Sequence, residues 1–357
     1  MTQSGHRRVP FLSTRGSWYD PQSEPGGTTA MKRREFLKAI AGLGIAWPRI
    51  AIAQQSALPI VGFLSGRSLK SDAHLVVAFR QGLSEAGYVE GRNVAIEFRW
   101  ADDQFDLLPG MASSLAAAKI SALFAGAIDA QIKAIKSAIA TTPAVFATGG
   151  DLVELGIVES INRPGGNITG VSLRASELWP KQLEVLRDLL GPEKTIGLLV
   201  NPNNVTAKIA VRDAQAAAKT IDQNIVIIDV RSVSELSSAF ATLIQQRVGA
   251  SLVTVDALFT NQREKIVSLA STHKVPTLYG RREFVEAGGL ISYGANTNDQ
   301  YRQSGVYVGR ILSGAKPSNL PVQQPTKFEL LINLKAANAL GLTVPRTLLE
   351  RADEIID

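Results

Sequence analysis

Short runs of consecutive apolar residues alternate with amphipathic segments along most of this chain. The run at 60–64 is followed by a segment, 73–86, in which Leu75, Phe79 and Leu83 recur at helical spacing, and a glycine then ends the predicted helix. Further apolar runs lie at 94–98, 120–124 and 144–147. Strands that are apolar at every position are covered on both faces, which is typical of parallel sheets in α/β proteins. We therefore predict an α/β fold.

The same pattern begins again in the second half of the chain. The run at 196–200 precedes an amphipathic segment at 206–221, and further strands are predicted at 225–230, 252–255 and 277–279. Ser232 and Glu235 have the spacing of a capping box, which predicts that a helix begins at Ser232. The repeat indicates two similar, doubly wound halves, at about 58–167 and 172–288.

Three turn-rich segments are places where the chain could pass from one half to the other. They lie at 162–167, 288–291 and 318–321. In two open parallel sheets that face each other, the carboxyl ends of the strands meet at one shared cleft. The predicted architecture is a two-lobed clamp joined by three crossover strands. Its first lobe spans 58–167 plus about 292–318, and its second spans 172–288 plus about 324–357.

An export signal is predicted at 31–53. Arg33 and Arg34 begin it, the apolar run at 39–47 is too short to span a membrane, and the small-x-small pattern before Gln54 predicts cleavage near Ala53–Gln54. Residues 1–30 precede a second methionine and have no apolar periodicity. We interpret them as a non-native, disordered upstream extension, and we expect the remaining protein in the periplasm.

Charge and cysteine content narrow the function further. The segment 1–53 holds eight Lys and Arg and three Asp and Glu, so its removal lowers the formal net charge from +6 to +1. A nearly neutral chain lacks the basic surface that nucleic-acid binding requires. The chain has no cysteine, which excludes disulfides, a lipidated cysteine anchor and thiolate metal sites. We expect a soluble monomer that does not span the membrane.

Few residues suit catalysis. The sequence has no H-E-x-x-H, G-x-S-x-G, Walker or G-x-G-x-x-G motif, and neither His74 nor His273 has a partner at metal-ligand spacing. We therefore expect no metal, no cofactor and no enzymatic activity. Two of the three carboxylates at Asp102, Asp103 and Asp106 could form an acid–base pair, although a solvated loop in which one Asp caps the next helix is the favoured interpretation.

Small and hydrogen-bonding residues follow the predicted strands. Such loops suit a small polar ligand, because backbone N–H groups bind a carboxylate, Asp binds an ammonium group and Tyr offers a ring face. Each residue could equally cap a helix or form a turn. The predicted ligand-binding residues are Ser65, Gly66, Arg67, Gly126, Ala127, Thr148, Gly149, Asp151, Asn201, Asn203, Asn204, Asp256, Tyr279, Arg281 and Tyr293.

Several longer motifs resemble one known family. They are R-R-E-F-L-K in the leader, V-G-F-L-S-G at 61–66, F-R-Q-G-L-S-E-A-G-Y-V-E-G-R-N-V at 79–94, N-R-P-G-G-N-I-T-G-V-S at 162–172, L-V-N-P-N-N at 199–204, R-E-F-V-E-A-G-G-L-I-S-Y-G at 282–294 and P-V-Q-Q-P-T-K-F-E-L-L-I-N-L-K-A-A at 321–337. Across 31–357 the chain resembles the periplasmic solute-binding proteins of ABC importers, in the group related to tryptophan and tyrosine receptors.

The resemblance implies a type I periplasmic binding fold with crossover strands near 167–173, 289–294 and 317–326. It places Ser65, Thr148, Asn201, Asn203, Asp256 and Tyr279 on loops that face the interlobe cleft. Two loops depart from the family pattern. The loop after Phe124 reads A-G-A-I-D where relatives often have G-G-T-P, and the loop after Ala147 reads T-G-G-D-L where relatives often have G-D-D-P. The identity of the ligand is therefore not carried over.

The predicted function is capture of a small polar solute, of the amino-acid type and with an aromatic amino acid as one candidate, by hinge closure. The partners would be an inner-membrane permease and its cytoplasmic ATPase. Two alternatives remain open at this point. One is a sensor that docks on a chemoreceptor or a histidine kinase, and the other is an exported enzyme that uses Asp151 or Asp256 with Arg281. A cytoplasmic repressor is disfavoured by the leader and by the lack of a helix-turn-helix segment.

Overall fold

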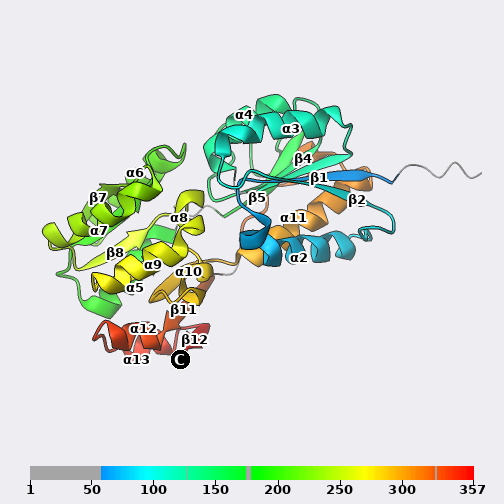
Figure 1. Cartoon of the computed structure of the whole chain (residues 1–357). Helices are drawn as coiled ribbons and strands as arrows, with labels where there is room; N and C mark the ends of the chain where they lie inside the picture. The colour runs from blue at the N-terminus through cyan, green and yellow to red at the C-terminus, as the bar shows by residue number, and fades with distance from the viewer. Residues whose placement is uncertain (1–57, 127, 174–177, 326–327) are drawn as a thin grey trace, which may run out of the picture. The chain divides into compact units, whose positions relative to one another are not determined.

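A computed structural model describes residues 58–126, 128–173, 178–325 and 328–357. The predicted extension at 1–30 and signal peptide at 31–53 lie outside these residues. The first lobe contains a five-stranded parallel sheet in the order β2-β1-β3-β4-β5 (Figure 1). Its strands are β1 (Ile60–Ser65), β2 (Ala95–Trp100), β3 (Ala122–Gly126), β4 (Ala144–Thr148) and β5 (Ile168–Ser172).

Helices cover both faces of this sheet (Figure 1). They are α2 (Leu69–Glu85) and α11 (Thr297–Leu312) on one face, and α3 (Leu108–Ala117) and α4 (Ile132–Ala138) on the other, with short 3₁₀ turns η1 (Phe105–Leu107), η2 (Asp129–Gln131) and η5 (Pro317–Asn319). Neighbouring strand residues point to opposite faces. Phe63 and Phe124 pack with α2 and α11, whereas Leu64 and Leu123 pack with α3 and α4. This two-sided burial explains why the inner strands β1, β3 and β4 are almost wholly apolar, whereas the partly buried edge strand β2 contains Glu97 and Arg99.

Helix α2 begins four residues earlier than predicted because Ser68 caps it. The Ser68 side chain accepts a hydrogen bond from the backbone N–H of Ser71, and the Ser71 hydroxyl accepts one from the Ser68 N–H. Close packing on α11 then requires a glycine in α2. A Cβ at Gly82 would lie 1.8 Å from the carbonyl oxygen of Arg302, so any side chain there would push the two helices apart.

The second lobe contains a seven-stranded sheet in the order β12-β11-β10-β9-β8-β6-β7. Its strands are β6 (Ile196–Val200), β7 (Ile225–Asp229), β8 (Ala250–Val253), β9 (Thr277–Tyr279), β10 (Ile291–Ala295), β11 (Phe328–Asn333) and β12 (Glu354–Ile356). The sheet is not wholly parallel, because β11 runs antiparallel to β10. The chain re-enters this lobe there after a passage through the first lobe.

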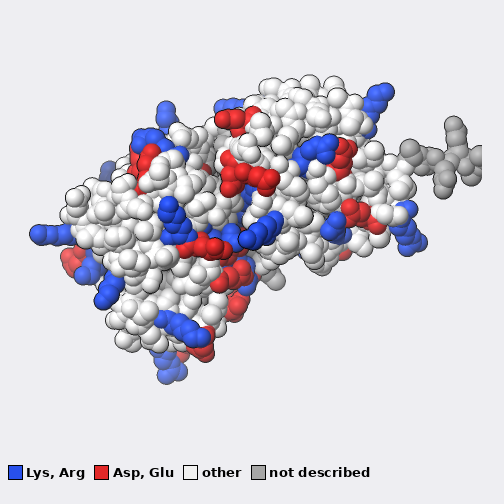
Figure 2. Space-filling model, viewed as in Figure 1, with Lys and Arg blue, Asp and Glu red and all other residues white. Residues whose placement is uncertain are grey.

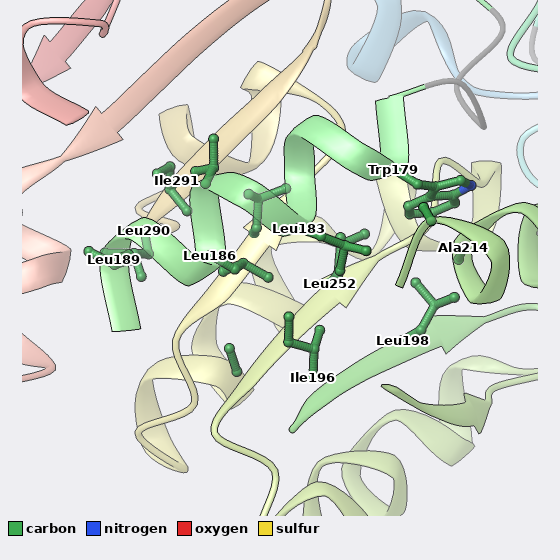
Figure 3. Packing of buried hydrophobic residues seen from close by; sticks show 14 of the residues in the cluster. Trp179, Leu183, Leu186, Leu189, Ile196, Leu198, Ala214, Leu252, Leu290 and Ile291 are labelled. Carbon is green, nitrogen blue, oxygen red and sulfur yellow. The ribbon is translucent and has the colours of Figure 1, made fainter. Parts of the chain in front are cut away.

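The helices of the second lobe are α5 (Trp179–Leu190), α6 (Ala207–Thr220), α7 (Leu236–Gln245), α8 (Ala257–Asn261), α9 (Arg263–Thr272), α10 (Arg282–Glu286), α12 (Leu334–Ala339) and α13 (Arg346–Leu349), with a 3₁₀ turn η4 (Val233–Glu235). On one face of the sheet, Leu183 and Leu186 of α5 pack against Leu198 and Leu252 (Figure 3). The other face packs on α7 and α9. Two α/β lobes of this kind confirm the predicted fold class.

The predicted capping box at Ser232 is wrong. The Ser232 side chain makes no capping hydrogen bond to the helix. The Glu235 carboxylate accepts its backbone hydrogen bond from the N–H of Arg231 instead, at 2.9 Å. In the 3₁₀ turn at this point, the Glu235 N–H, which a capping Ser232 hydroxyl would bind, donates instead to the carbonyl oxygen of Ser232 at 3.1 Å.

The chain passes between the two sheets three times. The passages lie between β5 and α5, between β10 and α11, and between η5 and β11. The second passage corrects the predicted boundary at about 292. Strand β10 is paired with β9 on one side and β11 on the other, so the second lobe extends to Ala295. Near the third passage, Gln323 exchanges backbone hydrogen bonds with Gly170 and Ser172 beside β5.

The visible surface carries charges of both signs, with Lys and Arg interspersed among Asp and Glu (Figure 2). Among the described helices, none combines the length and apolar character needed to cross a bilayer.

Candidate functional site

Two adjoining cavities lie between the carboxyl ends of the strands of the two sheets. The larger has a volume of about 620 Å³, and the smaller has a volume of about 40 Å³. Both are lined from both lobes, and they share Asp129 from the first lobe and Asn201, Asn204 and Asp256 from the second. We call the two cavities together the cleft.

Asp256 occupies the second-lobe wall of the cleft, directly after β8. It caps α8 by accepting a hydrogen bond from the Leu258 N–H at 2.8 Å. The same carboxylate accepts one from Asn204 Nδ2 at 2.7 Å and a longer one from Asn201 Nδ2 at 3.3 Å. Burial raises the pKa of Asp256 above its ordinary value, against the opposing effect of the bonds from Asn204 and Asn201.

The two asparagines are held in place by the loop that follows β6. Asn201 Oδ1 accepts the N–H of Asn203 at 3.1 Å, and Asn204 Oδ1 accepts both the N–H and the hydroxyl of Thr206. These local turns fix which amide group points at Asp256, because each carbonyl oxygen is already occupied. The N-P-N-N motif thus forms a preorganised polar wall.

The first-lobe wall is formed by the turns after β3 and β4. Asp129 accepts a hydrogen bond from the hydroxyl of Thr148, and Thr148 Oγ1 accepts the Gly150 N–H at 3.0 Å. Asp151 accepts the N–H of Val153 at 2.7 Å and so orders the turn after β4. The backbone of this turn, at 149–151, faces the smaller cavity.

The lobes also meet directly beside the cleft. A Cβ at Gly149 would lie 3.4 Å from Val255, and a Cβ at Gly150 would lie 3.0 Å from a methyl group of Thr206. Arg212 of the second lobe forms an ion pair with Glu154 of the first at 2.9 Å. The glycines of the T-G-G-D-L loop therefore allow the two walls to approach each other.

Six of the predicted residues line the cleft: Gly149, Asp151, Asn201, Asn203, Asn204 and Asp256. Thr148 supports Asp129 from behind without lining either cavity. Ala127 lies outside the described residues. The remaining seven predicted residues also line neither cavity; they are Ser65, Gly66, Arg67, Gly126, Tyr279, Arg281 and Tyr293.

Arg67 and Arg281 belong instead to a buried group of charges that joins the lobes, which we call the buried charge cluster. In the first lobe, Arg67 Nε lies 2.9 Å from Asp72 Oδ1, and the side chains are 3% and 0% exposed. In the second, Arg281 lies 3.8 Å from Glu283. Burial pushes the pKa of Glu283 up, but the charges of Arg281 and Arg67 outweigh it and hold that pKa below its ordinary value.

Ser65, Gly66 and Gly126 support this cluster rather than the cleft. The Ser65 hydroxyl donates to Asp72 at 3.1 Å, and the Gly66 N–H donates to the carbonyl oxygen of Gly126. A Cβ at Gly126 would lie 2.4 Å from the hydroxyl of Tyr301, so the glycine makes room for that ring. None of these three strand-end residues lines either cavity.

The two predicted tyrosines pack within the second lobe. The Tyr279 ring is 1% exposed and stacks on Phe284, with 4.5 Å between the ring centroids. The Tyr293 ring lies 6.3 Å from that of Phe328. Both rings therefore have a packing role, and neither lines either cavity of the cleft.

Sequence reasoning missed Asp129, Trp179 and Arg231, all of which line the cleft. Asp129 stands in a loop that departs from the family pattern, which was the available signal. Trp179 begins a helix rather than following a strand, so the strand-end rule could not find it. Asp103 and Asp106 line the larger cavity, although a solvated loop was the favoured interpretation. No group of three or more metal-ligating side chains occurs among the described residues.

The comparisons with known proteins agree with this geometry. A tyrosine-binding protein of Clostridioides difficile is 26% identical over 264 residues, which cover 74% of this chain and 75% of that protein. A solved ABC domain in complex with L-Trp, from Streptococcus pneumoniae, is 27% identical with a TM-score of 0.76, over 84% of this chain and 100% of the other. A conserved domain protein of Vibrio cholerae, 24% identical, shares the fold with a TM-score of 0.76, over 83% and 99%.

Of these relatives, one is a tyrosine-binding protein and one was solved in complex with L-Trp, which favours a binding protein over the exported-enzyme alternative. The type I periplasmic fold and the relation to tryptophan and tyrosine binders are both confirmed. A model of the family of ABC transporter substrate binding proteins matches residues 58–356. With two α/β lobes, a cleft lined from both and this match over nearly all of the described residues, the chain belongs to the ABC transporter substrate-binding protein family.

Proposed function

We propose that this protein is the extracytoplasmic receptor of an ABC importer and that it captures a small polar ligand by closing its lobes. The observation that carries the proposal is the shared wall of the cleft. Asp129 comes from one lobe, and Asn201, Asn204 and Asp256 come from the other. A ligand seated there contacts both lobes only when they are close together, so its binding favours the closed state.

The wall residues have distinct proposed roles. Asp256 is oriented by two asparagines and by the backbone N–H of Leu258, and its carboxylate accepts hydrogen bonds from an ammonium group of the ligand. Backbone N–H groups of the turn at 149–151 offer donors to polar oxygens. Apolar atoms of Val200 and Ile209 line the smaller cavity and suit an organic body. A ligand of the amino-acid type has this combination of groups. Micromolar binding requires about 8 kcal/mol, which a few charge-assisted hydrogen bonds and one buried body supply.

The proposed setting follows from the leader. Its twin-arginine start and cleavage pattern support export to the periplasm, and the family supports an inner-membrane permease with its ATPase as the partner. A sensor that presents its solute to a chemoreceptor or histidine kinase uses the same closure. Stimulation of the reconstituted permease ATPase by the loaded receptor separates the two, because a pure sensor gives no stimulation.

Closure itself has a direct test. The chain has no cysteine, so cysteines introduced at exposed Val153 and Val205, one in each lobe near the place where the lobes meet, accept spin labels selectively. A thermal-shift screen of amino acids, amines and small acids first identifies a binder, since a ligand at 100 times its Kd adds about 2.7 kcal/mol of stability. That binder should shorten the distance between the labels. Labels placed at Val77 and Val89, both in the first lobe, should show no change. A binder that leaves the interlobe distance unchanged would refute hinge closure.

A further inference from the structure

The wall of the larger cavity carries an excess of negative charge. Four carboxylates line it, from Asp103, Asp106 and Asp129 of the first lobe and Asp256 of the second. Arg231 is the one cationic side chain among its lining residues. The Arg231 guanidinium already pairs with Asp229 at 2.7 Å, which leaves little of its charge to balance the wall.

Within the described part of the chain, these carboxylates accept hydrogen bonds from neutral groups. Asp256 accepts from amides, as described above, and Asp129 accepts from the hydroxyl of Thr148. Asp106 accepts from Gln131 Nε2 at 3.1 Å, and Asp103 accepts from the side-chain amide of Asn261. Neutral donors orient carboxylates without cancelling their charge. Apart from the charge of Arg67, which acts on Asp103, the negative charge of the wall is therefore available to a ligand.

A second, independent feature marks the adjoining smaller cavity as a ligand position. Trp179 lines this cavity with its side chain 4% exposed, and its indole Nε1 has no hydrogen-bond partner among the described residues. The indole nitrogen lies on the side of the ring away from Leu183 and Leu252 (Figure 3). A buried donor without a partner is costly, so it points to an acceptor that arrives with the ligand.

We propose that the cleft selects small organic cations, with a net charge of +1 or more, over zwitterions that have the same body. The cationic group lies between Asp129 and Asp256, and a neutral oxygen of the body, such as a hydroxyl group, accepts a hydrogen bond from the indole N–H of Trp179. A zwitterion brings a carboxylate into a wall that already has surplus negative charge, and like charges repel most strongly where water is scarce. This inference rests on the proposed function, because it specifies the ligand of the same cleft.

Matched ligand pairs test the proposal by isothermal titration calorimetry. Serotonin differs from 5-hydroxy-L-tryptophan only in the missing carboxylate, tyramine differs from L-tyrosine in the same way, and L-arginine differs from L-citrulline by the charge of nearly isosteric side chains. We expect the more cationic member of each binding pair to bind at least tenfold tighter, which corresponds to about 1.4 kcal/mol. Equal or tighter binding of the zwitterion would overturn the proposal, as would failure of all three cations to bind.

Removal of single carboxylates shows which side chains cause the preference for cations over zwitterions. Asp129→Asn keeps an acceptor for Thr148, and it should weaken cation binding at least fivefold while leaving zwitterion binding unchanged or stronger. Asp188→Asn changes the net charge equally on an exposed surface outside the cleft and should leave both affinities unchanged. Asp106→Asn, at an exposed position of the wall, provides the same test if the first variant does not fold. If a folded variant of the wall keeps the full preference for cations over zwitterions, the wall carboxylates do not cause that preference and the proposal is refuted.

The outcomes separate this inference from the proposed function. A zwitterion or an uncharged ligand that binds tightly and closes the lobes would leave the receptor function standing and remove the charge selection. A cation that binds in the cleft without closing the lobes would leave charge selection standing and remove the hinge mechanism.

Discussion

Substitution of Asp72 by Ala should destabilise the first lobe strongly. Asp72 is fully buried, and it forms an ion pair with Arg67 at 2.9 Å and accepts a hydrogen bond from the Ser65 hydroxyl. The substitution leaves a guanidinium buried without its nearest counter-ion, which typically costs about 3–5 kcal/mol. Glu283 lies close enough to influence Arg67 and compensates in part. We therefore expect about 3 kcal/mol, at the low end of this range.

The exposed pair Arg80–Glu90 supplies the control. Its atoms are closer, at 2.6 Å, but the side chains are 46% and 31% exposed. An exposed ion pair contributes about 0–1 kcal/mol, because water and salt screen it. Glu90→Ala should therefore have a small effect. Burial, and not distance, decides the difference between the two pairs.

Urea unfolding of both variants, followed by circular dichroism, measures the two losses. Hydrogen exchange then shows which lobe has lost stability, since a two-lobed chain need not unfold in one step. Protection should fall over 60–126 and stay unchanged over 196–279. The double substitution Arg67→Met with Asp72→Leu should recover much of the loss, because it removes both charges. The reasoning is refuted if Asp72→Ala costs no more than Glu90→Ala.

Three further predictions concern packing, pH and the contact between the lobes. Gly82→Ala should destabilise by about 1–3 kcal/mol in urea unfolding, because α11 backbone occupies the space, whereas Gly110→Ala, in an open part of α3, should stabilise by about 0.5–1 kcal/mol. The raised pKa of Asp256 means that the folded state binds the proton of this carboxyl group more tightly than the unfolded state does. The stability gained from this tighter binding is fully present below the ordinary pKa of 3.8 and is lost as pH rises through the pKa of the folded state. The stability of Asp256→Asn relative to wild type should accordingly increase with pH in urea midpoints from pH 4 to 7, and a constant difference would contradict this. Arg212→Ala, which breaks the exposed pair with Glu154, should change ligand Kd less than about fivefold by calorimetry.

The elements of the fold could be predicted because their signals are local. Each apolar run overlaps a strand, because a strand covered on both faces buries nearly all of its side chains and so favours apolar residues. The errors concern boundaries and caps, which depend on single hydrogen bonds. Ser68 rather than a later residue begins α2, and Glu235 reaches the N–H of Arg231 rather than that of Ser232.

The candidate site could be predicted only in part. The strand-end rule found Asn201, Asn204 and Asp256, whose partners lie within the same wall of the cleft. It also named Arg67 and Arg281, which line neither cavity, because each side chain pairs with a carboxylate only a few residues along the chain, Asp72 and Glu283. Strand ends specify a place in the fold and leave the direction of a long side chain open.

From the sequence alone, the periodicity of apolar residues determined two α/β lobes, and the loops after the strands determined which segments approach the cleft. Only the tertiary structure decided which side chains form it. Trp179 and Asp129 are about 50 residues apart in the chain, yet they line the same cavity. The physical reason is that apolar burial depends on each residue's own pattern, whereas the charge and shape of a cleft depend on pairs of residues that only the folded chain brings together.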